Sequence, residues 1–396
     1  MKKAKFLIYA AVAATAAIVS SCSNEDVVEQ TPQKGRPIVV EASVDGDSRA
    51  SVATSFTGFK LYGYDQANEG AQFLNGVGFA NSGTAWTSVG AANWPTGTGA
   101  CDFYAISVDG AAPTALPDNI DITDLATGSF AYTVPTDVAD QQDLLVAKQN
   151  DVAYADNAGK IKLGFKHALA NVTMQVRFNF TENNNPVVSE DISECLFSFD
   201  RIKIHNVYTS GTYNASTGVW TPTGELGTIT LNFPQAPVYK AYDADEDIYK
   251  TGIKYQDIVL GSAGASLMVM PQTFESYWVN NDPKDNPVPV ANAEAAHQPY
   301  IEIHGVVYTT SSTTENDTPF NYTPEQLADD EGVGALFDVL IGEDEYLAQN
   351  IYIPLKSPFV FGVNKNYNLR LNILGAFAED GTTAFTPVEA AGGDNP

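Results

Sequence analysis

Histidine and acidic side chains on expected strands are the groups in this 396-residue chain that could bind a metal or move a proton. Glu302 and His304 stand two residues apart in YIEIHGVVYT, so they share one face of a strand, and metal sites use this spacing. No third ligand lies in register near them. We therefore interpret them as an outward, solvated pair rather than a zinc site. His205 stands at the end of another expected strand.

The acidic run YDADEDIY is similar to the start of a calcium-binding loop, because Asp243, Asp245 and Asp247 occupy alternate positions. A complete loop needs a glycine where this chain has Ile248 and a bidentate glutamate where it has Lys254. We therefore predict no metal site and no cofactor.

Sequence motifs of catalysis are missing as well. The chain has neither G-x-S-x-G nor H-E-x-x-H, and GSAGAS (261–266) lacks the lysine of a phosphate-binding loop. Pairs of carboxylates are uninformative because Asp and Glu number 48 against 21 Lys and Arg. We predict that the protein is not an enzyme. Its net charge of -27 repels phosphate backbones, which excludes nucleic acid as a partner.

The N-terminus has the pattern of an exported lipoprotein. MKKAKFLIYAAVAATAAIVSSC begins with lysines, continues with an apolar run too short to span a membrane, and ends in a sequence similar to a lipobox. We predict a signal peptide at 1–21 and a lipid on Cys22, with an ordinary signal-peptidase site as the alternative. A polar, flexible tether at 22–36 follows. Of the other cysteines, Cys101 and Cys195 either pair or lie buried separately.

The regular structure expected around these histidine and acidic side chains consists of strands. Short β-like runs separated by Gly, Pro, Asn and Asp clusters extend from residue 37 onward, so we predict an all-β protein. In NVTMQVRFNF (171–180) apolar and polar residues alternate strictly, which is typical of an antiparallel sandwich with one face in water. The polar, proline-containing stretch 181–194 predicts a boundary between domains at 50–182 and 183–396.

The first strand is followed directly by an exposed arginine. In GRPIVVEASVDGDSRAS (35–51) the side chains expected to face a core are Ile38, Val40, Ala42 and Val44. Burying this face contributes roughly 5 to 9 kcal/mol. The turn behind it contains Arg49 and Ala50, where a trypsin-like protease can cut.

Several phrases, spread in order over residues 36–374, together resemble the fimbrillin family, the lipoprotein-precursor subunits of type V pili. These phrases are SRASVATSF, NWPTGTGACDFYAIS, DLLVAKQ, LGFKHALANVTMQV, NVYTSGTYNASTGVW, ASLMVMPQTF and FVFGVNKNYNLRLNI. The resemblance implies two tandem transthyretin-like antiparallel β-sandwich domains. It also implies a precursor that is lipid-anchored in the cell outer membrane and then joins a fimbrium at the cell surface.

The resemblance further implies that an arginine-specific protease removes the N-terminal segment with its first strand, and that a strand from another pilus subunit fills the groove. Cleavage after Arg36 would leave the strand attached, and Pro37 disfavours it, so we predict a cut between Arg49 and Ala50 that removes the strand at 37–49. The alternative is that GDSR is an ordinary surface turn.

The donor strand and the function each leave an alternative open. NYNLRLNIL (366–374) or the tail from 376 to 388 would be the donor, and stalk, tip and accessory subunits are all compatible with the sequence. The alternative function is a monomeric outer-membrane surface lipoprotein that binds glycans or host ligands. It would use tryptophans in or near loops, namely Trp86, Trp94, Trp220 and Trp278.

Overall fold

The computed structural model describes the larger part of the chain after the tether, and residues 36–396 form one compact unit. The described residues are 35–44, 56–83, 85–96, 99–111, 115–156, 158–179, 181–182, 185–186, 192–233, 238–243, 256–258, 267–274, 299–311, 349–354, 359–377, 383–385 and 389–391.

Strands make up nearly all of the regular structure, which confirms the all-β prediction. Within the described ranges there is no α-helix, and the helical elements are single 3-10 turns: η1 (Gln66–Asn68), η2 (Leu125–Thr127) and η3 (Val138–Asp140). Aspartate side chains accept a backbone N–H at the start of η1 and η3, which is the usual way to begin such a turn.

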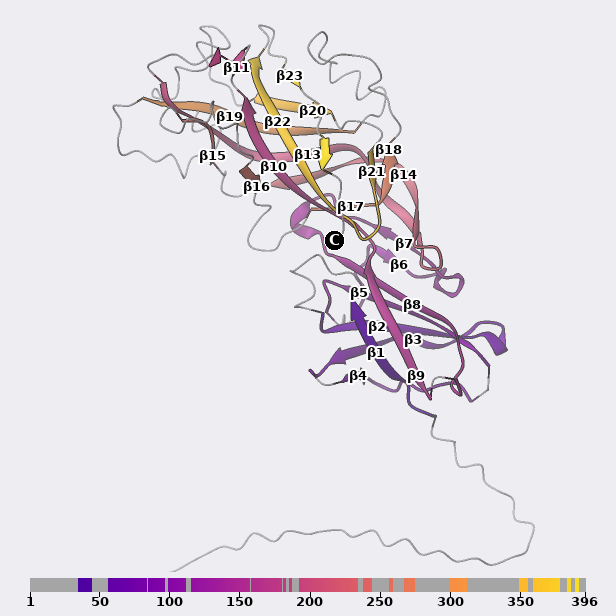
Figure 1. Ribbon diagram of the computed structural model, residues 1–396. Helices are drawn as coiled ribbons and strands as arrows, with labels where there is room; N and C mark the ends of the chain where they lie inside the picture. The colour runs from indigo at the N-terminus through magenta and orange to yellow at the C-terminus, as the bar shows by residue number, and fades with distance from the viewer. Residues whose placement is uncertain are drawn as a thin grey trace, which may run out of the picture. The chain divides into compact units, whose positions relative to one another are not determined.

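The first sheet has seven strands in the spatial order β1-β9-β8-β5-β2-β3-β4 (Figure 1). In that order their bounds are β1 (Val39–Val44), β9 (Lys160–His167), β8 (Leu144–Val152), β5 (Cys101–Val108), β2 (Gly58–Asp65), β3 (Ala71–Asn81) and β4 (Trp86–Val89). Neighbours in this sheet are antiparallel except for β1 and β9, which run parallel.

Alternating side chains of these strands build the first core. On β9 the lysines point outward while Ile161, Leu163 and Phe165 are fully buried. Phe59 of β2 and Phe103 of β5 join them in the same cluster. A strand with one buried and one solvated face is what the period-two pattern predicts.

The second large sheet is organised around one long strand, β13 (Ile192–Asn214). Its order is β20-β19-β13-β7-β6, with two more strands on β13. The bounds are β20 (Gln349–Pro354), β19 (Tyr300–Ser311), β7 (Ser129–Thr133), β6 (Ile120–Asp121), β14 (Val219–Asn232) and β15 (Val238–Asp243). Register shifts interrupt the pairing of β13 with β14, β15 and β19, and such bulges bend a long strand.

The third sheet pairs β10 (Ala170–Asn179) with β22 (Asn366–Phe377) in parallel, although the two are far apart in sequence (Figure 1). Its other strands are β16 (Gln256–Ile258), β17 (Leu267–Val269), β23 (Thr383–Phe385) and β24 (Glu389–Ala391). Two-stranded pieces complete the described structure: β11 (Thr181–Glu182) with β12 (Asn185–Pro186), and β18 (Gln272–Phe274) with β21 (Phe359–Phe361).

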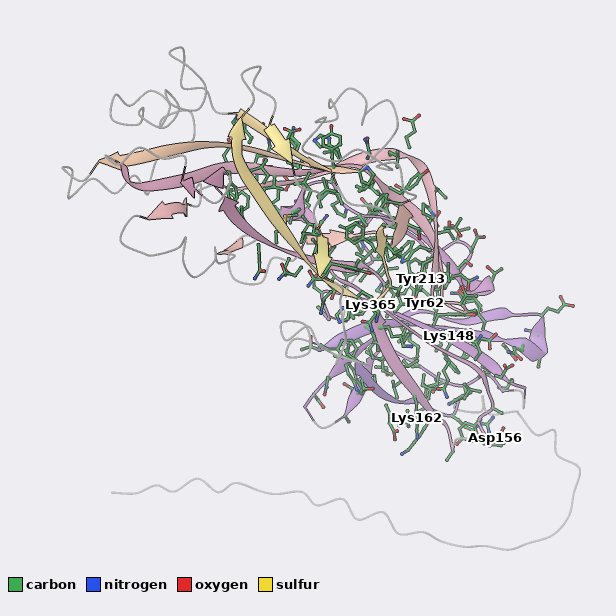
Figure 2. The ribbon with its side chains drawn as sticks, turned by 45° about the horizontal axis from the view of Figure 1, so that its top comes forward. Tyr62, Lys148, Asp156, Lys162, Tyr213 and Lys365 are labelled. Carbon is green, nitrogen blue, oxygen red and sulfur yellow. The ribbon has the colours of Figure 1, made fainter. Side chains whose placement is uncertain are left out.

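A second core is rich in aromatic rings. It includes Tyr62 of β2 and Tyr213 of β13, both labelled in Figure 2, together with Phe130 and Trp220. The indole nitrogen of Trp220 donates to the carbonyl oxygen of Ala168 across 2.7 Å, so the buried ring is also anchored by a hydrogen bond. The division into tandem transthyretin-like sandwiches at residues 182 and 183 stays a prediction.

Candidate functional site

Strand β1 lies at the edge of the first sheet, with β9 as its hydrogen-bonded neighbour in the strand order. The pairing is parallel and continuous over the length of β1, and it places Val40 opposite Ile161 and Glu41 opposite Lys162. Because the strand is at the edge, removing it leaves the order of the other six strands unchanged. An edge position is compatible with the predicted removal of residues 37–49, which stays a prediction.

The loop before β5 holds the beginning of β1 from its other side. The backbone N–H of Ile38 donates to the carbonyl oxygen of Ala92 across 2.9 Å, and the backbone N–H of Trp94 donates to that of Arg36 across 2.9 Å. The strand therefore fills a gap between β9 and the segment around residues 92–94. Figure 1 shows β1 and β9 side by side in this sheet.

Alternate side chains of β1 enter the core. Ile38 and Val40 are 7% and 4% exposed, whereas Val39 between them is 45% exposed. Ala42 and Val44 are half-buried against the same core cluster. The predicted face is thus the inner face, but its burial decreases along the strand. The two fully buried side chains contribute about 3 to 6 kcal/mol, so the value of the whole face lies nearer the lower end of the expected range.

An aromatic floor lies beneath the second half of β1. Phe56 packs 4.8 Å from Phe165 and 5.1 Å from Trp86, measured between ring centroids. The indole nitrogen of Trp86 donates to the carbonyl oxygen of Ala42 across 3.3 Å. Trp86 thereby binds the backbone of β1 through a hydrogen bond. Its ring is part of the apolar surface that packs against the first core beneath the strand.

The outer face of β1 carries an ion pair with β9. The Nζ atom of Lys160 donates to Glu41 Oε1 across 3.0 Å, and Lys162 faces Glu41 in the parallel register. Hydrogen bonding and the charge of Lys160 lower the pKa of the Glu41 carboxyl, with a smaller contribution from Lys162. Figure 2 labels Lys162 on this sheet. Lys160, Lys162 and Trp86 were not predicted as part of this site, although alternating lysines and apolar residues in KIKLGF (160–165) indicate an outward charged face.

The guanidinium of Arg36 lies over the ring of Tyr154, 3.8 Å from the ring centroid. This cation–π contact, added to the hydrogen bond at its carbonyl oxygen, keeps Arg36 engaged with the folded sheet. Arg36 is itself exposed, so these two contacts, and not burial, fix its position.

Several predicted residues lie outside the described part of the chain. These are Cys22, the cleavage pair Arg49 and Ala50, and Trp278. The acidic residues of the calcium-like run are described only as far as Asp243, which ends β15. Lipidation and cleavage therefore stay predictions.

The interpretation of Glu302 and His304 as an outward, solvated pair was wrong. Glu302 is buried and accepts hydrogen bonds from Lys203 Nζ at 3.0 Å and His205 Nε2 at 2.7 Å. His304 Nδ1 lies 2.7 Å from Asp200 Oδ1 instead. Strand β13 runs beside β19, and its cross-strand side chains supply hydrogen-bonding partners for both groups.

The electrostatics of Glu302 follow from this arrangement. Burial by itself raises the pKa of its carboxyl, but the hydrogen bonds and charges of Lys203 and His205 outweigh that effect and leave the pKa lowered. His205 also stacks on Tyr300 with ring centroids 4.4 Å apart.

A further buried pair joins His167, at the end of β9, to Asp143, just before β8, with 2.5 Å between Nδ1 and Oδ2. The backbone N–H of Asp143 donates to the carboxylate of Asp109 across 2.7 Å. Burial is the main reason that the pKa of Asp109 is raised. The described residues include no group of three or more His, Cys, Asp or Glu arranged to hold a metal ion.

Cys101 is a free cysteine, buried in the first core, so it does not pair with Cys195. Burial is the main cause that raises the pKa of its thiol to about 11, with smaller contributions from Asp65 and Asp102. Such a thiol stays protonated near neutral pH and behaves as a small apolar side chain.

The tryptophans that the structure describes are packed inward. Trp94 and Trp220 are buried, and Trp86 is half-buried against the first core. Stacking platforms for sugars need exposed ring faces, and these three do not form one. Among the residues that the structure describes, no helix is long and apolar enough to cross a membrane.

Together these features define an all-β protein whose first core is completed by an edge strand near its N-terminus. A family model described as fimbrillin-like matches residues 48–329. The chain therefore belongs to the fimbrillin-like family, as the phrases in its sequence predicted.

Solved structures with similarity to this chain come from Bacteroides and Parabacteroides species. A fimbrial protein from Bacteroides vulgatus has 14% sequence identity and a TM-score of 0.51, and the match covers 90% of this chain and 98% of that one. A protein assigned to cell adhesion from Bacteroides uniformis has 15% identity and a TM-score of 0.44, with 92% and 100% covered. Another from Parabacteroides distasonis has 8% identity and a TM-score of 0.45, with 90% and 96% covered. No curated protein matches the chain.

Proposed function

We propose that this protein is a structural or accessory subunit of cell-surface fimbriae that contributes to adhesion and is not an enzyme. It is exported as a precursor anchored in the outer membrane by a lipid on Cys22. An arginine-specific protease cuts between Arg49 and Ala50, and the segment containing β1 leaves. A strand of another subunit then takes its place in a fimbrium. Membership of the fimbrillin-like family supports this role.

The observation that carries the proposal is the position of β1. It is an edge strand whose inner face, Ile38 and Val40, is part of the first core, so the core is incomplete without it. Its loss would expose apolar side chains of the floor and the unpaired backbone groups of β9. An exposed edge of this kind binds another strand readily.

The contacts of Arg36 support cleavage elsewhere than after Arg36. Arg36 precedes β1 and is held by Trp94 and Tyr154, so a cut there is disfavoured and would leave β1 joined to the rest of the chain. Cleavage at Arg49, beyond the end of β1, separates the strand from everything that follows. It also separates the lipid on Cys22 from the mature subunit, which would then be held by the polymer.

The test is native cleavage of the chain from Ser23 to Pro396 by an arginine-specific protease. We expect one new N-terminus at Ala50, followed by oligomers in sedimentation velocity. An Arg49→Gln variant should stay uncut and monomeric, and Arg36→Gln should behave as wild type. Oligomers formed by uncut protein, or cut protein that stays monomeric after the β1 peptide has been removed, would contradict the proposal.

A further inference from the structure

One face of the first sheet gathers lysines in an acidic chain. Lys160, Lys162 and Lys166 are exposed on one side of β9, since even numbers of residues separate them. Lys148 of β8 belongs to the same face, because Val146, two residues before it, is the register partner of Lys166. Figure 2 labels Lys148 and Lys162 on this sheet. Two neighbouring strands thus carry four of the 21 Lys and Arg residues.

Carboxylates are scarce on this face of the described strands β1, β9 and β8. Glu41 of β1 is the acidic residue at their outward positions, and its Oε1 atom lies 3.0 Å from the Nζ atom of Lys160. Asp151, near the end of β8, accepts a hydrogen bond from Gln66 of η1 across 2.9 Å. The face therefore keeps an excess of positive charge, although the net charge of the chain is -27.

The spacing of these lysines favours a ligand whose anionic groups are sparse. A strand rises about 3.3 Å per residue, so Lys160 and Lys162 are about 7 Å apart, and Lys162 and Lys166 about 13 Å. Gly164, between the latter two, has no side chain, so the face is low there. Duplex DNA carries one charge per about 1.7 Å, and most of its phosphates would meet no lysine. A polysaccharide with one carboxylate in each disaccharide places neutral sugar units between its charges.

The negative charge of the whole molecule does not prevent this contact. At physiological ionic strength the Debye length is about 8 Å, so more distant exposed charges are largely screened. A dense polyanion that extends beyond the lysines meets the acidic remainder of the surface, whereas a sparse one brings fewer like charges there. Lysine side chains are flexible point charges, which suit carboxylates at variable positions along a polymer.

We propose that this lysine row, made of Lys148, Lys160, Lys162 and Lys166, binds an extended acidic polysaccharide with one carboxylate in each disaccharide. The three lysines of β9 contact the carboxylates. The ammonium of Lys148 donates to the carbonyl oxygen of Ser216 across 2.8 Å and is held in place by that bond. The proposal rests on the adhesive part of the proposed function, because it names the class of ligand.

The test is isothermal titration calorimetry of the uncut chain from Ser23 to Pro396 with hyaluronan oligosaccharides, which carry one carboxylate per disaccharide. We expect binding at about 0.05 M sodium chloride that is at least about tenfold weaker at about 0.5 M. Replacing the three lysines of β9 by glutamine should weaken binding about tenfold. Glu41→Gln should bind about threefold tighter, because Lys160 loses its competing carboxylate.

Matched controls separate charge from fold and position. Replacing the same three lysines by arginine keeps the charges and should keep the binding. Lys60→Gln changes one charge on β2, three strands from β9, and should bind as wild type. Hyaluronan with its carboxylates reduced to alcohols should not bind, and duplex DNA should bind at least about tenfold more weakly than hyaluronan.

Absence of hyaluronan binding by both wild type and Glu41→Gln would overturn the proposal, as would equal binding by wild type and the triple glutamine variant. Duplex DNA that binds as well as hyaluronan would show a general polyanion contact and overturn it too. Assembly of the cut chain is measured separately. Cut protein that assembles, with no hyaluronan binding before the cut, overturns this proposal alone. Hyaluronan binding without assembly after the cut overturns the proposed strand exchange and leaves the polysaccharide site.

Discussion

The indole nitrogen of Trp94 donates a hydrogen bond to the carbonyl oxygen of Gly159 across 3.2 Å. This bond joins the two sides of the groove that holds the start of β1, namely the segment 92–94 and the beginning of β9, without involving β1 itself. Trp94 precedes β5, and Gly159 immediately precedes β9. The ring of Trp94 also packs against Phe103, with 5.1 Å between the ring centroids. The end of the groove that receives Ile38 is therefore held together by the folded sheet, so it can persist when the strand is absent.

Trp94→Phe should lower the free energy of unfolding of the precursor by about 1 to 3 kcal/mol, since a buried hydrogen bond and part of a ring are lost. The loss should be larger after cleavage and removal of β1, because Gly159 then loses the donor from Val39 as well. Urea unfolding before and after cleavage measures both values. Trp220→Phe, which removes a comparable bond to Ala168 in the second core, is the control and should show no dependence on cleavage.

Val40→Ala should destabilise the precursor by about 1 to 3 kcal/mol, because the side chain is 4% exposed and its removal leaves a space in the core. Its neighbour Val39 is 45% exposed, so Val39→Ala should change the stability by no more than about 0.5 kcal/mol. Urea unfolding of the uncut chain compares the two. Equal losses would mean that β1 does not hold the alternating register seen in the structure.

Glu302→Gln should reduce stability at neutral pH by about 1 kcal/mol, because charged hydrogen bonds from Lys203 and His205 become weaker. The folded-state pKa of Glu302 lies below its ordinary value of 4.5, so the charge stabilises the fold above that pH. This contribution is lost as the pH falls through the lowered folded-state pKa. The difference between variant and wild type should therefore shrink in acid.

Urea unfolding between about pH 3 and pH 7 follows that difference. The control is the exposed Glu225 on β14, a strand that pairs with β13 and not with β19. The Glu225→Gln variant should stay close to wild type in stability throughout this pH range. A Glu302→Gln deficit that stays constant down to the lowest pH would rule out the charged state as its cause.

Cys101 should not react with a thiol reagent in the native protein at pH 8, because its thiol is buried and its pKa is raised to about 11. The experiment uses the chain from Ser23 with Cys195→Ser, so that Cys101 is the one thiol present. We expect one equivalent of label per chain in denaturant and almost none in the native protein. Rapid native labelling would show that the first core opens more readily than its packing implies.

Residue patterns predicted the local features of this protein well. Alternation in PIVVEASV identified the inner face of β1, and Ile38 and Val40 are buried as that pattern requires. Alternation does not identify the neighbouring strand. The parallel partner of β1 begins at Lys160, more than a hundred residues later, and nothing in either segment encodes the pairing by itself.

Pairing between strands far apart in the sequence also explains why predictions from short sequence runs were wrong for some residues. Glu302 and His304 share a strand face as predicted, but β13 brings Lys203, His205 and Asp200 against them and changes their environment. His205, predicted to stand at the end of a strand, lies inside β13, which continues to Asn214. The strand continues because β14 and β7 pair with the residues after His205, and local sequence does not show that pairing.

The sequence by itself determined that this chain forms strands, which side chains of its first strand face a core, and which family it belongs to. These conclusions need no tertiary structure, because the period of the side chains and the family's short phrases are properties of contiguous residues. Only the tertiary structure decided that β1 lies parallel to β9, that Trp86 and Trp94 contact its surroundings, and that Lys160 and Lys162 face Glu41. Those relationships join segments far apart in the chain, and their register is set by the packing of the whole sheet.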